Sequence, residues 1–249
     1  MEMTFKNKHV VITGAASGIG LALLHQLSNA NKISVVCRPS DNLDKLRETY
    51  PSIDIYEADL ADTNQVETAA EELIKSDQDI DFLIHNAAVQ YTPKFTDEDF
   101  RYDTIHREIA VNFTAICILT YLLMPLLLKD TRSTIVNINS GLGLVPKTSS
   151  AVYCATKGAL NIFSKSLALQ LEDTNVRVQQ VFLPLVDTAM TRGRGRGKLS
   201  VEKAAADIIK GLEKRANWAS GDIDIGKVKA LRFINRLSPR LAQRIMKAG

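Results

Sequence analysis

The chain has 249 residues, 45% of them hydrophobic, and its 31 basic and 28 acidic residues leave a formal net charge of only +3. This length and composition fit one globular domain with a full core, and the small basic excess does not indicate a nucleic-acid partner. The three cysteines have no paired spacing, so we expect neither a disulfide framework nor a metal site, and a reducing, cytoplasmic interior is the simplest setting.

A buried-strand pattern begins by His9, which leaves no room for a signal peptide. A glycine-rich turn over residues 13–20 follows this strand and precedes an amphipathic helical segment. In this order the turn lets the backbone approach a pyrophosphate, while the helix N-terminus supplies N–H groups and a partial positive charge. The turn lacks the Gly-Lys-Ser/Thr ending of a P-loop, which argues against phosphoryl transfer. We expect a dinucleotide rather than a plain turn here, contacted by Gly14, Ser17, Gly18, Ile19 and Gly20.

The end of the second predicted strand, residues 33–38, bears on the choice of cofactor. An acidic side chain there accepts hydrogen bonds from the ribose 2′-hydroxyl, whereas an arginine pairs with a 2′-phosphate. This strand ends in Cys37 and Arg38, and no carboxylate follows before Asp41. The pattern favours NADP(H) over NAD(H), although Arg38 can also stack on the adenine of NAD.

Further predicted strands over residues 53–60 and 81–85 alternate with a helix over 63–75. This alternation predicts an α/β fold, a Rossmann-like three-layer αβα sandwich with a doubly wound parallel sheet and its site at the strand C-termini. The Asp59 carboxylate can accept from the adenine amino group or cap the next helix. Small residues after the later strand permit close approach of a flat ring or ribose, and Asn86 can pin neighbouring strands. The cofactor contacts expected here are Asp59, Leu60, Asn86, Ala87 and Ala88.

The second half begins with a polar, irregular segment over 89–103 and a long predicted helix over 103–129, which carries Asn112. Its apolar run, 113–128, is shorter than the roughly 20 residues that a membrane span needs. A strand over 134–140 ends in Ser140, and a helix from about 150 to 171 carries Tyr153 and Lys157 on one face. A free phenol has a pKa of about 10. A nearby cation lowers that pKa, so we expect Lys157 to bring Tyr153 toward the working range of an acid–base group.

These positions together resemble the short-chain dehydrogenase/reductase family, in its compact form, over residues 8 to about 190. Residues 13–20 match Thr-Gly-x-x-x-Gly-x-Gly, and residues 86–88 match Asn-Ala-Gly except for the final Ala88. The catalytic tetrad of the family is matched, with the Ser-to-Tyr spacing, by Asn112, Ser140, Tyr153 and Lys157.

The resemblance implies a carbonyl/alcohol oxidoreductase that needs no metal. Tyr153 would exchange a proton with the carbonyl oxygen, and Ser140 would stabilise charge on that oxygen. Lys157 would bind the nicotinamide ribose and lower the pKa of Tyr153, and Asn112 would hold a relay water. The family's Pro-Gly-x-Val-x-Thr element appears with Pro184 in place of glycine, which puts the backbone path there in doubt. The nicotinamide contacts expected from this element are Val186 and Thr188.

An Arg/Gly run over 191–198 lies where the family carries a substrate lid, here expected over about 189–200. It is either a solvated loop or a lid that closes over the cofactor phosphate or an anionic substrate group. A helix over 200–214, with Ser200 as its N-cap, and a last strand over 222–226 complete a dinucleotide-binding domain, residues 1–226.

Residues 227–249 form a basic C-terminal tail with apolar residues at helical spacing: Val228, Leu231, Ile234, Leu237, Leu241 and Ile245. Arginines at positions 232, 236, 240 and 244 form a second stripe, and Pro239 is expected to break the helix. The tail either packs on its own domain or on another subunit, or lies on an anionic membrane surface.

The sequence therefore predicts an NADP(H)-dependent reductase of an apolar or lipid-like carbonyl compound, in a homodimer or homotetramer. The apolar substrate is suggested by Leu142, Leu144, Val145, Leu185 and Met190. The alternatives are an NAD-dependent alcohol dehydrogenase and a non-catalytic, cofactor-binding regulatory or scaffold protein.

Overall fold

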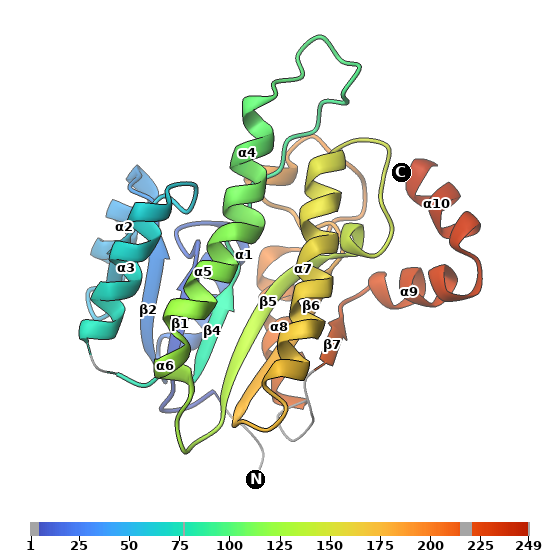
Figure 1. The fold of residues 1–249 in the computed structure, drawn as a ribbon. Helices are drawn as coiled ribbons and strands as arrows, with labels where there is room; N and C mark the ends of the chain where they lie inside the picture. The colour runs from blue at the N-terminus through green and yellow to red at the C-terminus, as the bar shows by residue number, and fades with distance from the viewer. Residues whose placement is uncertain (1–4, 77, 215–220, 249) are drawn as a thin grey trace.

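The computed structural model describes residues 5–76, 78–214 and 221–248, and within them seven parallel strands form one sheet. The strand order is β3-β2-β1-β4-β5-β6-β7 (Figure 1). The chain moves outward from β1 to β3, returns to the other side of β1, and moves outward again to β7. The order reverses between β1 and β4, and a ligand site is expected at the carboxyl ends of the strands there. The Rossmann-like fold predicted from the sequence is confirmed.

Each strand expected from the sequence is present, with small differences at the ends. The largest difference is in the third strand, expected over 53–60, where pairing stops at Glu57 and leaves Asp59 in the following loop. The bounds are β1 (His9–Thr13), β2 (Lys32–Cys37), β3 (Asp54–Glu57), β4 (Phe82–His85), β5 (Ser133–Ser140), β6 (Val176–Leu183) and β7 (Gly221–Asp224).

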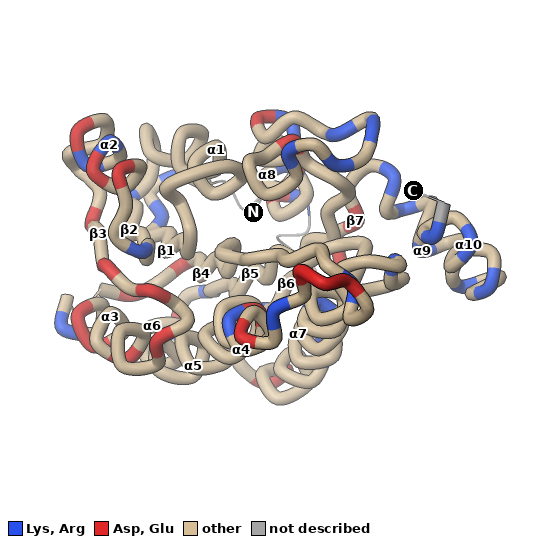
Figure 2. The backbone as a smooth tube through the Cα atoms, turned by 90° about the horizontal axis from the view of Figure 1, so that it is seen from above, with Lys and Arg blue, Asp and Glu red and all other residues tan. Residues whose placement is uncertain are grey.

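Helices cover both faces of the sheet, as the views in Figures 1 and 2 show. One face carries α1 (Gly18–Leu27), α2 (Asp41–Thr49) and α8 (Val201–Lys214). The other carries α3 (Thr63–Lys75), α4 (Asp103–Ile109), α5 (Ala115–Leu122), α6 (Met124–Leu127) and α7 (Ala151–Gln170). Beyond β7 lie α9 (Val228–Leu237) and α10 (Pro239–Ala248).

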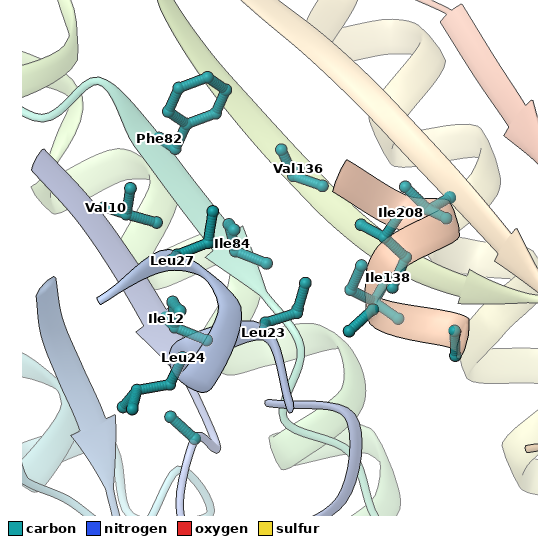
Figure 3. Close-up of a cluster of buried hydrophobic side chains, with 14 of the residues drawn as sticks. Val10, Ile12, Leu23, Leu24, Leu27, Phe82, Ile84, Val136, Ile138 and Ile208 are labelled. Carbon is teal, nitrogen blue, oxygen red and sulfur yellow. The ribbon is translucent and has the colours of Figure 1, made fainter. Parts of the chain in front are cut away.

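Alternating residues of the strands divide the core into two layers. Val10 and Ile12 of β1 pack with Leu23 and Leu24 of α1 (Figure 3), whereas Val11 faces the opposite layer. All five side chains are fully buried. Burial of a side chain of this kind stabilises the fold by about 1.5–3 kcal/mol. The sheet is thus fixed on both faces, which leaves its carboxyl edge for a site.

Helix α2 was not predicted from the sequence, although its signals are present. The Ser40 hydroxyl accepts a hydrogen bond from the Leu43 N–H at 3.3 Å, as an N-cap does. Leu43 and Leu46 lie three apart and are buried, and Asp41 and Asp44 occupy the first turn. The helix follows Arg38 closely and closes one side of the site.

The long helix expected over 103–129 is instead interrupted twice. A π-helical turn, Ala110–Thr114, separates α4 from α5, and the backbone leaves helical geometry at Leu123 before α6. Pro125 lies in the first turn of α6, where its missing N–H costs no hydrogen bond. The first interruption places Asn112 in a widened turn, a feature common at functional sites.

At the amino edge of the sheet, Asp81 joins three segments of the chain. Its carboxylate accepts from the His9 N–H at 2.8 Å and pairs with Lys8 at 3.1 Å and Lys129 at 3.3 Å. Its side chain is only 13% exposed. Burial by itself raises the pKa of Asp81, but the His9 N–H and the two lysines hold it below its usual value.

We expect Asp81→Asn to lower the free energy of unfolding at pH 7 by about 2 kcal/mol, because buried partners lose a charged acceptor. Since the folded-state pKa of Asp81 is depressed, its contribution is present above the unfolded pKa of about 3.9 and is lost as the pH falls through the folded value. Urea denaturation of both proteins at pH 7 and at successively lower pH measures the difference.

Asp44→Asn is the matched control, since its carboxylate is 70% exposed and pairs with Arg47 on the surface of α2. That change should cost less than about 0.5 kcal/mol. An equal loss of unfolding free energy in the two variants at pH 7 would contradict the stabilising role assigned to Asp81.

Candidate active site

A cavity of about 960 Å³ lies at the carboxyl edge of the sheet and runs from the glycine turn to the C-terminal helices. Small-molecule sites usually have volumes of about 300–1,000 Å³. Two residues expected in the site do not line it: Gly20 is buried beneath the turn, and Asn112 is fully buried behind the wall. The expected residues that do line it are Gly14, Ser17, Gly18, Ile19, Arg38, Asp59, Leu60, Asn86, Ala87, Ala88, Ser140, Tyr153, Lys157, Val186 and Thr188.

The turn between β1 and α1 requires glycine. Gly14 and Gly18 have φ angles of +71° and +56°, a region that other residues rarely adopt. A Cβ on Gly14 would lie 2.9 Å from the Ala87 Cα, and one on Gly20 would lie 2.3 Å from the Gly14 oxygen. These contacts bring the backbone of the turn close to β4 and keep its outer side open to the cavity.

Asn86 ties the ends of β1 and β4 together, as the sequence suggested. Its side-chain amide donates to the main-chain oxygens of Thr13 at 3.0 Å and Gly14 at 3.2 Å. The Thr13 hydroxyl in turn accepts from the N–H groups of Asn86 and Ala87 at 3.0 and 3.1 Å. The floor of the cavity is therefore fixed by hydrogen bonds.

The N-terminus of α1, which follows the turn, is able to bind an anion. Ser17 is the N-cap of α1, yet its hydroxyl makes no capping hydrogen bond. The hydroxyl and the first N–H groups of a 10-residue helix are thus free for a phosphate. Together with the glycine positions, this arrangement fits a dinucleotide.

Next along the cavity, Arg38 lies close to Asp59. The Asp59 carboxylate pairs with Arg107 at 3.0 Å and accepts from the Ala61 N–H at 3.0 Å. Burial by itself raises the pKa of Asp59, but these partners and the charge of Arg38 hold it below its usual value. The cap of α3 is Asp62, so the alternative that Asp59 caps this helix is wrong. Arg38 remains exposed at the cavity, because Arg107 neutralises the carboxylate.

At the other end, Ser140 and Tyr153 meet. Ser140 is the last residue of β5 and Tyr153 lies in the first turn of α7; both line the cavity, and the Ser140 side chain lies close enough to the Tyr153 hydroxyl to act on its pKa. The Lys157 amine lies 5.8 Å from the centre of the Tyr153 ring and donates to the Ile138 oxygen at 2.8 Å. The structure thus brings three of the four expected catalytic side chains to one place.

The pKa values differ from the sequence expectation. Burial raises the pKa of Tyr153 to about 12, although the Ser140 side chain and the charge of Arg194 act in the opposite direction. Burial also lowers the pKa of Lys157 to about 8. In this structure the Lys157 amine is directed to the Ile138 oxygen, and burial, the largest cause, places the pKa of Tyr153 above its usual value rather than in the working range expected from the sequence.

Asn112 holds the wall of the site together through its side chain. Its amide oxygen accepts from the Val89 N–H at 2.8 Å, and its amide nitrogen donates to the Val89 oxygen at 2.9 Å and the Thr156 hydroxyl at 3.3 Å. Through these hydrogen bonds, the π-helical turn is joined to the segment after β4 and to α7. The amide is satisfied by protein atoms, as in a buried structural asparagine.

The segment after β6 keeps its place at the cavity despite Pro184. Val186 and Thr188 both line the cavity, and the main chain pairs with Leu199 through the Asp187 N–H at 2.8 Å. The loop 189–200 is fixed at its ends, since the Thr191 hydroxyl donates to the Val186 oxygen at 2.6 Å and Lys198 donates to Asp187 at 3.0 Å. Between these points it carries three glycines with positive φ at positions 193, 195 and 197.

The C-terminal helices also form part of the wall, which the sequence did not specify. Val228, Leu231 and Ile234 of α9 and Ile245 and Met246 of α10 line the cavity. Leu231 packs near Gly141, directly after Ser140. The expected break at Pro239 is confirmed, with Ser238 in an extended conformation between the helices. The tail packs on its own domain, one of the alternatives left open.

Of the apolar residues expected near the substrate, Leu142, Leu185 and Met190 line the cavity, whereas Leu144 and Val145 do not. Val145 belongs to the core. Polar lining residues that sequence reasoning missed include Gln90, Arg107 and Lys147, whereas Arg194 belongs to the Arg/Gly run expected as a lid. Gln90 and Lys147 lie in loops after strands, and Arg107 lies in the last turn of α4, which follows such a loop. Among the described residues, no helix is long and apolar enough to cross a membrane.

Comparison with known proteins bears on this site. The short chain dehydrogenase family model matches residues 8–198. The uncharacterized oxidoreductase DltE of Bacillus subtilis is 35% identical over 193 residues, which are 77% of this chain and 76% of that protein. A fatty acyl-CoA reductase of Acinetobacter baylyi is 28% identical over 84% of this chain and 74% of that protein. A short chain dehydrogenase of Burkholderia cenocepacia, solved in complex with NADP, superposes with a TM-score of 0.83 at 22% identity, covering 98% of this chain and 99% of that one.

The range matched by the family model covers most of the chain and contains the glycine turn, the Asn86–Ala88 segment and all four tetrad positions. The superposition independently supports the fold. The chain therefore belongs to the short-chain dehydrogenase/reductase family of NAD(P)-dependent oxidoreductases.

Proposed function

We propose that this chain is an NADP(H)-dependent reductase that interconverts a carbonyl and an alcohol on an apolar or lipid-like small molecule. The observation that carries this proposal is the meeting of the Ser140 and Tyr153 hydroxyls at one end of a cavity that also contains the glycine turn and Arg38. One cavity thus joins a dinucleotide cradle to two hydroxyls able to handle a carbonyl oxygen.

In this proposal, the bound cofactor supplies or accepts the hydride. Tyr153 gives its phenolic proton to the carbonyl oxygen in reduction and takes it back in oxidation. The raised pKa of about 12 keeps the phenol protonated at neutral pH, the form that reduction requires. Ser140 donates to the same oxygen and stabilises its developing charge.

We assign the nicotinamide ribose hydroxyls to Lys157, whose pKa of about 8 leaves it mostly cationic at neutral pH. The Asn112 side chain is already satisfied. We therefore assign the relay water implied by the family resemblance to the main chain of the π-helical turn that contains Asn112. The regular α-helical hydrogen bonds between the main-chain groups are interrupted in such a turn.

The preference for NADP(H) rests on Arg38. In the described part of the chain, this guanidinium forms no ion pair, and the nearby carboxylate of Asp59 is paired with Arg107. The end of β2 carries Cys37 and Arg38 rather than an acidic side chain for a ribose 2′-hydroxyl, and the Cys37 thiol accepts from the Ala15 N–H at 3.1 Å. The Burkholderia structure, which contains NADP, supports this choice.

An apolar substrate is favoured by the wall near Tyr153, to which Leu142, Leu185 and Met190 contribute together with Leu231 and Ile234 of the tail. We propose that residues 1–226 form the catalytic domain, that the loop 189–200 is its substrate lid, and that 227–249 is a separate helical tail. Parts of these ranges, residues 1–4, 77, 215–220 and 249, lie outside the described residues.

We also propose that the outer face of the tail rests on an anionic membrane surface. The tail contains seven Lys or Arg residues and no Asp or Glu, and Figure 2 shows basic positions along both helices. Phe233 and Leu237 are 65% and 70% exposed, and Leu241 is also exposed. Apolar side chains beside cations suit an interfacial helix.

For self-association we favour the outer faces of α5 and α7, where Tyr121, Ile162 and Leu169 are exposed.

Tyr153→Phe should lower NADPH-dependent turnover of a carbonyl substrate by about 10³-fold, because the proton donor is removed. The affinity for NADPH, measured by its fluorescence on binding, should remain. Tyr121→Phe, an exposed tyrosine on α5, is the control. Unchanged turnover in Tyr153→Phe would remove the assigned role and favour a cofactor-binding protein without this chemistry.

Arg38→Ala should weaken NADPH binding by about 10- to 100-fold, the loss expected for a charged hydrogen-bonded partner. NADH binding should change little. Dissociation constants for both cofactors, with Arg47→Ala on the outside of α2 as the control, measure the effect. Equal weakening of NADPH and NADH binding would show that Arg38 contacts only the part of the molecule that the two cofactors share. Tighter binding of NADH than of NADPH by the unmodified protein would favour the NAD-dependent alternative.

The tail proposal predicts co-sedimentation with phosphatidylglycerol vesicles at low salt and none with phosphatidylcholine. Replacing exposed Arg236, Arg240 and Arg244 by Gln should weaken binding by about 100-fold, since each cation near the surface contributes about 1 kcal/mol. The control replaces the exposed Lys45, Lys75 and Lys165 by Gln, which removes the same charge elsewhere.

Absence of binding to anionic vesicles, or equal loss in the control, would contradict the membrane assignment. Light scattering of the same samples reports the assembly state. A change of assembly in the arginine variant would instead identify the tail as a subunit contact.

A further inference from the structure

Two cations lie on the wall of the cavity: Arg194, in the loop 189–200, whose charge acts on Tyr153, and Lys147, in the loop between β5 and α7, whose charge acts on the adjacent Cys154. Arg194 donates from Nη1 to the Gln90 Oε1 at 3.1 Å. Gln90 in turn donates from Nε2 to the Ser150 hydroxyl at 3.2 Å, and Ser150 immediately precedes α7. This chain of hydrogen bonds fixes the guanidinium beside the segment that presents Tyr153.

The charge of Arg194 acts on Lys147, and the only carboxylate whose charge also acts on Tyr153 and Cys154, among the described residues, is that of Glu108. Burial and the charge of Arg194 both lower the pKa of Lys147. Burial likewise lowers the pKa of Arg194, while Tyr153 acts in the opposite direction. In the described chain neither cation forms an ion pair with an acidic side chain. The buried carboxylate of Glu108 is used by the Tyr91 N–H at 2.8 Å.

Holding two like charges together, partly out of water, is unfavourable unless an anion completes the arrangement. Guanidinium and ammonium groups are the usual partners of carboxylate and phosphate. The dinucleotide phosphates already have a place at the glycine turn and Arg38. Arg194 is instead tethered to Gln90 and Ser150, on the side of the reacting hydroxyls.

We propose that Lys147 and Arg194 bind an anionic group of the substrate, a carboxylate or a phosphate. The substrate would then be amphiphilic, with its apolar part against Leu142, Leu231 and Ile234 and its anion at the two cations. The position of its carbonyl at Ser140 and Tyr153 rests on the proposed function, whereas the anion site itself does not. Arg194 and Lys147 are thus specificity-determining residues.

The test measures binding rather than turnover. Isothermal titration calorimetry compares decanoate with decanol, which share an apolar chain and differ in charge, using the full-length protein with and without saturating NADP. Decanoate should bind about 10- to 100-fold more tightly, the range expected for charge-assisted hydrogen bonds. The preference should shrink with added NaCl.

Lys147→Gln and Arg194→Gln should each remove most of this preference while leaving the affinity for decanol unchanged. Arg192→Gln, an exposed arginine of the same loop that does not line the cavity, should keep it. Equal binding of decanoate and decanol to the unmodified protein overturns the proposal, even if the variants fail to fold. So does a preference that survives in both variants.

The affinity for NADPH tests whether the anion bound by Lys147 and Arg194 belongs to the cofactor instead of the substrate. The two variants should bind NADPH as the unmodified protein does, and a loss of NADPH affinity with decanoate preference intact would assign the pair to the cofactor. Failure of the proposed function is detected separately, by turnover of Tyr153→Phe, and does not alter the decanoate comparison.

Discussion

The hydrogen bonds between Asn86 and the end of β1 are the constraint on which the site depends. They hold the glycine turn against β4, where Gly14 leaves no room for a Cβ beside Ala87. Because the strand order reverses at this point, the same bonds fix the floor of the cavity. A second polar tie, from Asn112 to Val89, fixes the wall that leads toward α7. The half-buried amide of Asn86 and the buried amide of Asn112 thus fix the floor and the wall between the glycine turn and the reacting hydroxyls.

Charge is distributed unevenly along the cavity. The Asp59 carboxylate is paired with Arg107, whereas Glu108 accepts from the Tyr91 N–H. Among the described residues, Arg38 near the glycine turn and Arg194 near Tyr153 form no ion pair with a carboxylate. Electrostatic attraction therefore favours ligands with negative charge at two separate places, while the apolar wall between them favours hydrocarbon.

Much of the fold was predictable because its signals are local. Buried strands, the glycine turn and the Tyr153–Lys157 spacing each depend on a few adjacent residues. What the sequence could not supply depends on distant partners. The π-helical turn at Asn112 follows from contacts with Val89 and Thr156, and the raised pKa of Tyr153 follows from burial by several segments. Helix α2 differs, because its Ser40 cap and the Leu43–Leu46 spacing are local signals that predict a helix from adjacent residues.

The extended residue Ser238, between α9 and α10, divides the tail into parts with different attachments. Arg232 of α9 is tied to Asp224 of β7 at 2.6 Å and stacks on the Phe182 ring, so α9 is fastened to the sheet. Helix α10 reaches the cavity only through Ile245 and Met246. Swinging α10 about this hinge would break no strand pairing. The attachment of α10 to the rest of the domain is therefore independent of the strand pairing that holds the sheet together.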